Sequence, residues 1–324
     1  MPFPLGYIEQ RDAQWGVQGT SAEARIVAGQ QQVFYVEPAN ATANDDNEGT
    51  DPLFPLATIS EIVGRTAFWP QLAAGDVIYV KGTVSEAVTV PFTAPIGCSI
   101  VGVTNGSYVP RWSTPVNTNT CLTINQLAWR VSGIKFDIPA HGQAITLNWN
   151  VAANGSETII DNCYFMGGYA GHFGITAVGA PYAVHVLNCE FAEILNGATT
   201  GAAIYFGLAP TANALMWRIE NNLFWDNDNH ITSLAADNGL NTSVIKDNLF
   251  YQGEGIPTAL KLDLRGGSLG NNIVTGNFFG GDYSNAGGYY DSGAQASEWV
   301  GNWTADIAEA EVSDACTTIL PPAA

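Results

Sequence analysis

The stretch Trp217–Phe224, with the sequence WRIENNLF, decides the fold because its pattern returns along the chain. When the related segments are aligned on the closing phenylalanine, they end at Phe136, Phe165, Phe191, Phe250 and Phe279. The intervals between successive closing phenylalanines are 29, 26, 33, 26 and 29 residues. A period of this length indicates one supersecondary unit per repeat, which can bury its apolar face only by stacking on its neighbours.

Each repeat has a residue suited to a tight corner three positions before its phenylalanine. These residues are Gly133, Asn162, Asn188, Asn221, Asp247 and Gly276. Gly, Asn and Asp tolerate the left-handed backbone conformation that a sharp corner requires. Alternating, β-branched runs precede the corners, so each unit is predicted to be a short strand that ends in a corner and turns its phenylalanine onto the core.

The second half of the repeats predicts further short strands. The alternating runs cover residues 144–149, 174–178, 203–206, 231–234 and 260–264. Their period is two rather than 3.6, and no helical pattern lies between them. A leucine-rich repeat would need a leucine ladder, and a propeller blade would need a longer repeat. The predicted fold is therefore all-β, a parallel β-helix.

The position two residues before the phenylalanine is predicted to form an internal column. It holds Cys163 and Cys189 in two successive repeats, and then Asn222, Asn248 and Asn277. Because adjacent strands lie about 4.8 Å apart, we expect the thiols to stack as small buried groups rather than to form a disulfide. Stacked asparagine side chains can hydrogen-bond to one another along the axis, which satisfies amides that would otherwise be buried without partners.

Residues 1–32 lack the repeat and are predicted to be an extended N-terminal arm. Four scattered apolar residues, Tyr7, Ile8, Trp15 and Ile26, are the candidate binding and assembly residues. Such a segment cannot bury itself, so we expect it to dock on another surface rather than to remain a free tail.

The β-helix is predicted to span residues 33–303. Thr58 and Glu61 form a capping-box pattern, which predicts a short helix at about residues 57–68 with one apolar face. An open solenoid end exposes strand edges and apolar core, so this helix is expected to cover it. The acidic, Ala-rich tail, residues 304–324, is expected to cap the other end or to reach a neighbour.

The opening of this domain resembles a known family. It contains YVEP at residues 35–38, an Asn/Asp-rich loop ending in Gly49 and Thr50, PLATI at residues 55–59 and AGDVIYVKGTV at residues 74–84. This order is similar to that of the pectin-lyase-like right-handed parallel β-helix family, and the resemblance extends to about residue 303. It implies a right-handed solenoid but leaves the function open, because the superfamily includes polysaccharide lyases, glycosidases, adhesins and phage tailspikes.

The chain is acidic, with a net charge of −19 from 30 acidic residues against 11 Lys and Arg. This charge argues against a nucleic-acid surface, and against a polyanionic glycan as substrate unless a metal ion intervenes. The start of the chain has no basic segment followed by an apolar run, and no stretch approaches the roughly 20 apolar residues of a membrane span. We therefore expect neither a nucleic acid nor a membrane as partner. The chain is expected to be either a mature fragment or a protein released without the secretory pathway.

Two groups of charged residues are candidate catalytic sites. Asp226, Asp228 and His230 alternate along the chain and would converge if they lay on one strand. The alternative is a solvated loop after the corner at Phe224. A polysaccharide lyase needs a base, and Arg265 with Asp263 as its partner is the candidate; the alternative there is a salt bridge between coils.

A calcium site is the one cofactor suggested by the sequence. Asp45, Asp46 and Glu48 could supply oxygen ligands, although an Asx-rich turn is the alternative. The four histidines, His141, His172, His185 and His230, lack the spacing of metal ligands. No other cofactor is expected.

The remaining sequence feature that could indicate a binding function is a set of aromatic residues. They are expected either to stack on sugars and subunits or to lie in the core. The set is Trp129, Trp149, Trp217, Trp225, Trp299, Trp303, Tyr205, Tyr251, Tyr289 and Tyr290.

The leading hypothesis is a structural virion protein of a phage, either a capsid-surface decoration or a tailspike-like body. In this hypothesis it is a homotrimer on the outer surface of the virion, joined to other virion proteins through its arm, and it is not an enzyme. The alternatives are a secreted polysaccharide lyase or glycoside hydrolase, and an extracellular adhesin that binds a surface glycan.

Overall fold

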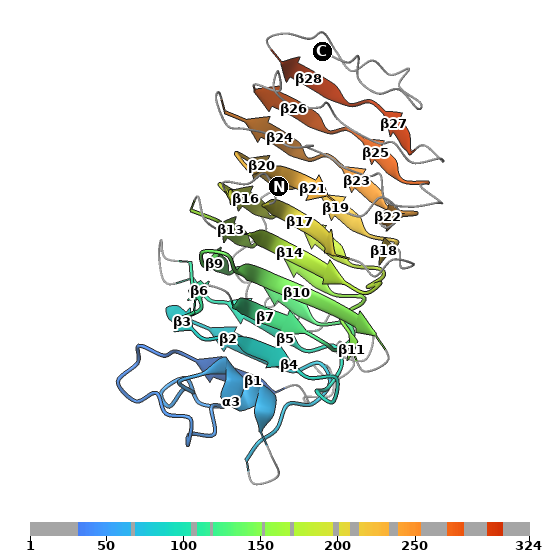
Figure 1. Ribbon diagram of the computed structural model, residues 1–324. Helices are drawn as coiled ribbons and strands as arrows, with labels where there is room; N and C mark the ends of the chain where they lie inside the picture. The colour runs from blue at the N-terminus through green and yellow to red at the C-terminus, as the bar shows by residue number, and fades with distance from the viewer. Residues whose placement is uncertain are drawn as a thin grey trace, which may run out of the picture.

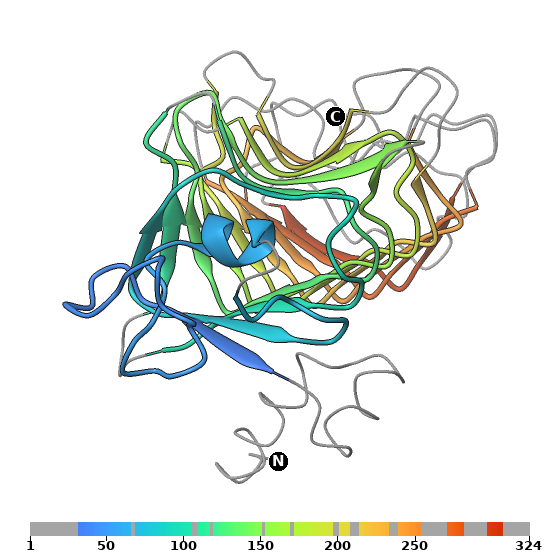
Figure 2. The same ribbon diagram turned by 90° about the horizontal axis from the view of Figure 1, so that it is seen from below.

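A computed structural model of the chain describes residues 32–65, 69–104, 109–116, 119–150, 153–168, 172–196, 201–207, 214–232, 239–253, 271–281 and 297–306. Its strands stack into three long sheets that wind around one axis (Figures 1 and 2). The predicted fold, an all-β parallel β-helix, is confirmed. The candidate docking residues of the arm lie outside the described residues. No described helix has the length and hydropathy to cross a membrane.

Each of the three sheets runs along the helix axis, and its strands are parallel. Sheet A has ten strands: β1 (Val33–Val36), β2 (Val77–Val80), β5 (Ser99–Gly102), β8 (Arg130–Ser132), β12 (Ile159–Asp161), β15 (His185–Leu187), β19 (Arg218–Glu220), β23 (Val244–Lys246), β25 (Ile273–Thr275) and β27 (Glu298–Val300). Sheet B has nine strands: β3 (Thr83–Ser85), β6 (Arg111–Ser113), β9 (Lys135–Asp137), β13 (Tyr164–Met166), β16 (Glu190–Ala192), β20 (Leu223–Trp225), β24 (Leu249–Gln252), β26 (Phe278–Gly281) and β28 (Trp303–Asp306).

Sheet C contains the second strand predicted for each repeat. Its strands are β4 (Val88–Val90), β7 (Thr120–Ile124), β10 (Gln143–Asn150), β14 (Phe173–Val178), β17 (Ala202–Gly207) and β21 (Asn229–Thr232), with β11 (Ala153–Asn154) pairing antiparallel to β10. Two further strands, β18 (Ala214–Leu215) and β22 (Leu240–Asn241), pair with each other in a separate sheet. Each of them directly precedes a strand of sheet A along the chain. The predicted run at residues 260–264 lies outside the described residues.

The corners between sheets A and B are left-handed, as predicted. Gly133, Asn162, Asn188, Asn221, Asp247 and Gly276 have φ angles between 52° and 69°. After each corner the closing phenylalanine points inward, and all six are fully buried. Their rings form one column, with successive centroids 5.3, 4.6, 4.8, 4.8 and 4.9 Å apart. The repeat seen in the sequence is therefore one strand, one corner and one step of this column.

The predicted asparagine ladder is confirmed and is longer than expected. Asn222 Nδ2 donates to Asn248 Oδ1 at 3.0 Å, Asn248 Nδ2 to Asn277 Oδ1 at 2.9 Å, and Asn277 Nδ2 to Asn302 Oδ1 at 2.9 Å. Each Nδ2 also donates to a backbone carbonyl of the preceding coil, such as Val186 O for Asn222. The ladder thus satisfies amides that are almost completely buried.

The cysteines of the described ranges are buried free thiols, as predicted for Cys163 and Cys189. Burial raises the pKa of the Cys189 thiol well above its ordinary value, and the neighbouring Cys163 adds to this effect. Burial also raises the pKa of Cys121 to about 12, with the charge of Asp137 as a further cause. These groups therefore act as small apolar residues of the core.

One short helix, α3 (Ile59–Gly64), lies across the N-terminal end of the solenoid (Figure 2). Thr58 is its N-cap and accepts a hydrogen bond from Glu61 N at 3.2 Å. The helix is shorter than the predicted range of about 57–68, of which residues 66–68 lie outside the described residues. Ile59 and Ile62 are buried in the main core, so the helix covers the open end as expected.

Candidate functional site

Asp226 and Asp228, two of the candidate catalytic residues, are hydrogen-bonded to backbone groups. Asp226 occupies a left-handed position with φ 53°, and its Oδ1 accepts a hydrogen bond from Gly253 N at 2.6 Å. Asp228 is only 4% exposed, and its Oδ2 accepts from Asn196 N at 2.8 Å and from Gly201 N at 3.2 Å. Both carboxylates therefore hold turns in place.

His230, the third candidate, belongs to the core. It is fully buried, and its ring lies 5.8 Å from that of Phe224 and 5.4 Å from that of Phe250. Its Nδ1 is 3.3 Å from Asn227 Nδ2. The expectation that these three residues share one solvent-facing strand face is wrong, because a corner at Asp226 breaks the alternation before β21 begins. The alternative of a solvated loop is also wrong for Asp228 and His230.

Of the other two candidate sites, the predicted calcium loop lies within the described residues and the predicted lyase site does not. Asp263 and Arg265 lie outside the described residues. In the predicted calcium loop, Asp45 Oδ1 accepts from Ala57 N at 3.0 Å and from Thr58 N at 2.9 Å, so this carboxylate ties the loop to the start of α3. Asp46 and Glu48 do not join it, because within the described ranges no three His, Cys, Asp or Glu side chains gather as a metal site.

An aromatic pair marks the outer face of sheet C, which curves toward the helix axis in Figure 2. Phe173 of β14 and Tyr205 of β17 stack with centroids 4.3 Å apart and planes 11° apart. Tyr205 lies between the buried residues Ile204 and Phe206 along its strand, so its side chain points outward. The Thr176 hydroxyl, in register with Tyr205, is buried without a hydrogen-bond partner. Sequence reasoning included Tyr205 among the surface aromatics but missed Phe173.

Polar side chains continue this outer face on the neighbouring strands. Gln143 is in register with Phe173, and its Oε1 accepts a hydrogen bond from Thr146 Oγ1 at 2.9 Å. Thr120 Oγ1 of β7 lies 3.4 Å from Thr146 Oγ1. Sheet C thus presents an aromatic surface beside a strip of hydroxyl and amide groups.

Two histidines meet at the edge of the same face. His141 and His172 precede β10 and β14, and their rings contact edge-to-face with centroids 5.5 Å apart. Burial lowers the pKa of His172 and the charge of His141 lowers it further, while a hydrogen bond to Asn196 and the charge of Asp228 oppose this shift. This pair could not be predicted from the sequence, because the contact arises only when coils stack in register.

Replacing His141 with Ala is expected to raise the pKa of His172 toward the ordinary value near 6.5, since one of the lowering charges is removed. In the wild type the folded-state pKa lies below the unfolded one. His172 therefore costs no stability above pH ~6.5, and stability is lost as the pH falls from there toward the folded pKa. An NMR titration of the imidazole protons, assigned with His172→Asn, measures the shift. An unchanged midpoint in His141→Ala would contradict the coupling.

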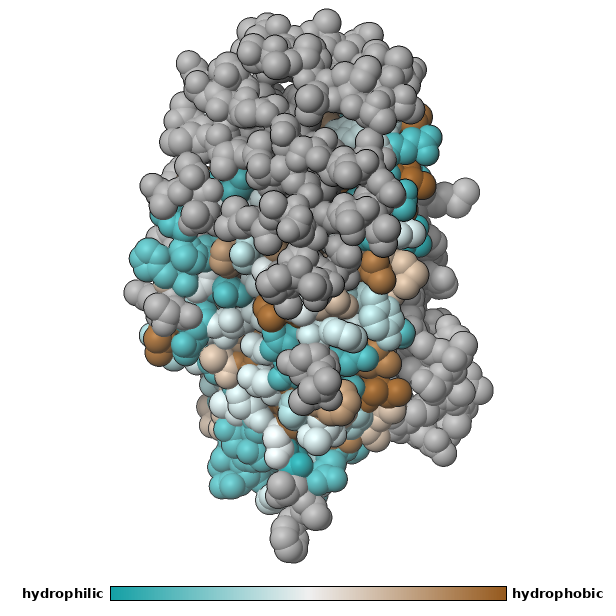
Figure 3. Space-filling model, turned by 45° about the vertical axis from the view of Figure 1, so that its right-hand side comes forward, coloured by the Kyte–Doolittle hydropathy of each residue, from teal (hydrophilic) through white to brown (hydrophobic). Residues whose placement is uncertain are grey.

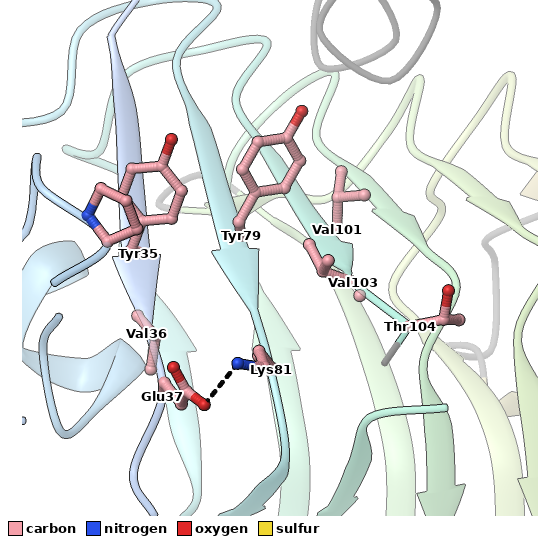
Figure 4. A pocket seen from close by; sticks show the side chains of 10 residues that line it. Tyr35, Val36, Glu37, Tyr79, Lys81, Val101, Val103 and Thr104 are labelled. Carbon is pink, nitrogen blue, oxygen red and sulfur yellow. Dashed lines mark ion pairs between the residues drawn. The ribbon is translucent and has the colours of Figure 1, made fainter. Parts of the chain in front are cut away.

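A pocket of about 460 Å³ opens on the outer face of sheet A near its N-terminal end (Figure 4). Tyr35 and Tyr79 line one side of it, with ring centroids 6.0 Å apart and tilted by 43°. An ion pair lies at the C-terminal end of the same strands, where Lys81 Nζ is 2.8 Å from Glu37 Oε1. The pocket combines aromatic walls with one charged pair.

An exposed apolar stripe runs along the outer face of sheet B. We define it by Tyr164, Leu249, Tyr251, Phe278 and Trp303, whose exposed fractions range from 40 to 54%. Leu249, Phe278 and Trp303 occupy the same register position on β24, β26 and β28. Toward the N-terminal end of the sheet this register position is occupied by Glu190, Tyr164, Lys135 and Arg111, so the charged Glu190 separates Tyr164 from the rest of the stripe.

The aromatic residues singled out in the sequence divide between core and surface. On the face of the molecule that Figure 3 shows, hydrophobic residues lie scattered among hydrophilic ones. Trp129, Trp217 and Trp299 are buried in the main core. Trp149, Trp303 and Tyr251 are exposed, and Tyr289 and Tyr290 lie outside the described residues. Trp225 is partly buried, and its Nε1 donates to Glu190 Oε1 at 3.0 Å at the edge of the stripe.

Comparisons with known proteins found similarity among solved structures only. No family model and no curated protein matches the sequence. The pectate lyase Pel9A is 14% identical, with a TM-score of 0.49 over 88% of this chain and 78% of that one. An alginate lyase from Paenibacillus sp. str. FPU-7 is 13% identical, with a TM-score of 0.44 over 76% of this chain and 92% of that one. The Dettilon tailspike protein is 12% identical, with a TM-score of 0.32 over 92% of this chain and 74% of that one.

Proposed function

We propose that this protein is a structural protein of a phage virion, the β-helical body of a capsid-surface decoration or tailspike, and that it assembles as a homotrimer. The apolar stripe on sheet B carries this proposal. Leu249 and Tyr251, Phe278 and Trp303 expose apolar surface on three neighbouring strands, and large exposed apolar surfaces mark interaction sites. A subunit interface would bury the tyrosine, phenylalanine and tryptophan side chains that interfaces favour.

The direction of the stripe suits a cyclic assembly. It follows one register position from strand to strand, so it runs parallel to the helix axis. Copies related by rotation about an axis parallel to the solenoid would present the same stripe to one another. Cyclic symmetry also points every N-terminal arm to the same end, which suits attachment to one particle.

Two further observations favour a structural role over catalysis. The carboxylates of Asp226 and Asp228 accept hydrogen bonds from backbone amides, and His230 lies in the core. These three residues therefore do not present a catalytic acid and a catalytic base together to the solvent. The net charge of −19 on a chain with 11 Lys and Arg suits a protein that must stay soluble on a particle surface.

The mass of the full chain in solution tests the assembly. Mass photometry is expected to show about 103 kDa, three copies of the 34.3 kDa chain. Leu249→Asp combined with Phe278→Asp is expected to give the monomer, because charges on the stripe would be desolvated in the interface. Val178→Asp, at an equally exposed position of sheet C, is the matched control and should leave the trimer intact. A wild-type monomer at micromolar concentration would sink the proposal.

A second function, recognition of a neutral glycan, is favoured by the outer face of sheet C. The stacked rings of Phe173 and Tyr205 offer an apolar platform for the C–H face of a sugar. Gln143 and His172 lie beside them as partners for sugar hydroxyls. The acidic surface would repel anionic polysaccharides, so the glycan is proposed to be uncharged.

Loss of binding in Tyr205→Ala tests this second function. On a panel of neutral glycans, the variant is expected to bind at least about tenfold more weakly, which corresponds to about 1.4 kcal/mol. Tyr251→Ala, which removes an exposed tyrosine from sheet B, is the control. Equal binding by Tyr205→Ala would remove glycan recognition from this face, and release of new reducing ends from a glycan would favour an enzyme instead.

A further inference from the structure

The pocket of Figure 4 has an aromatic end and a charged end. The aromatic end is formed by Tyr35, Tyr79 and Val101, which are in register on β1, β2 and β5. Glu37 and Lys81 follow two positions later along the chain and form the charged end. Because alternate residues of a strand share a face, both ends lie on the outer side of sheet A, as Figure 4 shows.

The tyrosine pair does not belong to the repeat. Its register row passes through all ten strands of sheet A, and on every strand after β2 the row holds no aromatic side chain. On β8 and β12, for example, the row holds Ser132 and Asp161, and Asp161 forms an ion pair with Arg130 at 2.6 Å. The stacking of coils therefore does not require Tyr35 and Tyr79.

The loop between β1 and α3 supplies a further wall of the pocket through Pro52. The backbone beside Pro52 is fixed by side chains, since Asp51 Oδ1 accepts a hydrogen bond from Leu53 N at 2.8 Å and Thr42 Oγ1 donates to Leu53 O at 2.6 Å. These bonds hold the loop without a ligand, so the wall is preformed. The volume of about 460 Å³ also lies within the range of about 300–1,000 Å³ that is usual for small-ligand sites.

The two charges of the pocket compensate each other. Lys81 Nζ lies 2.8 Å from Glu37 Oε1, and Asn40 Nδ2 donates to Glu37 Oε2 at 3.1 Å. Burial alone would raise the pKa of Glu37, but the hydrogen bonds from Lys81 and Asn40 and the charge of Lys81 lower it, so the carboxylate is ionised at neutral pH. Among the described residues that line the pocket, Glu37 and Lys81 are the charged ones. The described lining therefore has no net charge with which to attract an anion or a cation.

The same pair offers both a hydrogen-bond donor and a hydrogen-bond acceptor to a ligand. An ammonium group carries three N–H donors, and both oxygens of a carboxylate accept. The side chains of Lys81 and Glu37 are 42% and 22% exposed, so a ligand can reach both. The rings of Tyr35 and Tyr79 add an apolar surface beside them. The arrangement suits an uncharged ligand that has an apolar face and neighbouring hydroxyl groups.

We propose that this pocket binds a neutral sugar ring, either a free monosaccharide or the terminal unit of a glycan. The C–H face of the sugar packs against Tyr35 and Tyr79, and its hydroxyl groups hydrogen-bond to Glu37 and Lys81. The site shares no residue with the aromatic pair of sheet C or with the apolar stripe of sheet B. It therefore rests on neither of the functions proposed above.

An NMR titration of the full chain tests the proposal, with the methyl glycosides of glucose, galactose, mannose and N-acetylglucosamine as probes. The ring signals of Tyr35 and Tyr79, assigned with Tyr35→Phe and Tyr79→Phe, should shift in a saturable way with at least one probe. The uronic acid and the amino sugar of the same configuration should bind at least about tenfold more weakly, because the pocket has no net charge to balance theirs. Ring signals that stay in place with all four probes would overturn the proposal.

Removing one charge of the pair should change which sugar binds. Lys81→Met leaves the Glu37 carboxylate without its counter-charge, so this variant should prefer the amino sugar. Glu37→Gln leaves the ammonium, so it should prefer the uronic acid. Lys246→Met, which breaks the exposed pair with Asp247 on the same sheet, is the matched control and should keep the wild-type preference. A damaged fold would not produce two opposite changes, and an unchanged preference in both charge variants would contradict the site.

Tyr35→Ala tests the aromatic wall and separates this site from sheet C. It should weaken the binding reported by the Tyr79 signals at least about tenfold, whereas Tyr35→Phe, which keeps the ring, should bind like the wild type. Tyr205→Ala, on sheet C, should leave the Tyr79 shifts unchanged. If the Tyr79 shifts vanish in Tyr205→Ala and persist in Tyr35→Ala, the sugar binds on sheet C and the proposed pocket site is wrong.

Discussion

Asp161→Ala is expected to lower the free energy of unfolding by about 3–5 kcal/mol, because it leaves the Arg130 guanidinium buried without its counter-charge. The loss includes both charge-assisted hydrogen bonds at 2.6 and 2.7 Å. It also removes the acceptor of Ser132 Oγ at 3.3 Å. Chemical denaturation followed by circular dichroism measures the change.

A double substitution shows whether the unpaired charge of Arg130 causes this loss of stability. Arg130→Met with Asp161→Leu removes both charges and restores apolar volume, so its stability should lie close to that of the wild type. Lys246→Ala, which breaks the exposed pair with Asp247, should change stability by less than about 0.5 kcal/mol. If Asp161→Ala is as stable as this control, the ion pair is solvated rather than buried.

Asn248→Ala is expected to lower the free energy of unfolding by roughly 3–5 kcal/mol, since each buried polar group left without a partner costs about 1–3 kcal/mol. Asn248 Nδ2 donates to Ile219 O at 2.9 Å and to Asn277 Oδ1 at 2.9 Å. Its Oδ1 accepts from Asn222 N at 2.9 Å and from Asn222 Nδ2 at 3.0 Å. Alanine removes all four bonds and leaves a gap in the ladder.

The same denaturation experiment measures this loss, and hydrogen exchange locates it. The Asn222 amide should exchange faster, because its acceptor has been removed, whereas amides near α3 should keep their protection. Asn248→Cys places in this coil the residue that Cys163 and Cys189 supply in earlier coils, and it should cost less than Asn248→Ala because it fills more of the gap. A cost below about 1 kcal/mol for Asn248→Ala would show that the ladder is not needed for stability.

The interior contacts hold the coils together and leave the outer faces of the sheets available for the proposed functions. The phenylalanine column and the asparagine ladder run through successive coils and tie each one to the next. Their residues occupy the core-facing positions, so the outward-facing positions are free to differ between sheets. Sheet B uses them for the apolar stripe, sheet C for the aromatic pair with its polar strip, and sheet A for the buried ion pair of Arg130 and Asp161.

The sequence by itself determined the coil. The left-handed corners, the closing phenylalanines and the column of Cys and Asn could be predicted, because each depends on residues close together within one repeat. The capping helix was also predictable, since Thr58 and Ile59 carry local signals for a helix start and an apolar face. Asn302 was missed as the last step of the ladder, although the Gly301 corner before it is the same signal as Gly276 before Asn277.

Only the tertiary structure decided which side chains meet between coils and which way they face. Arg130 and Asp161 are 31 residues apart, and they pair because stacking places them on adjacent strands. His141 meets His172, and Phe173 meets Tyr205, for the same reason. Asp228 and His230 turned inward because the corner at Asp226 interrupts the alternation from which a shared face was predicted. The intervals between repeats vary from 26 to 33 residues, so the inter-coil register depends on loops whose length the strand pattern does not specify, and a shift of one residue moves a side chain to the opposite face.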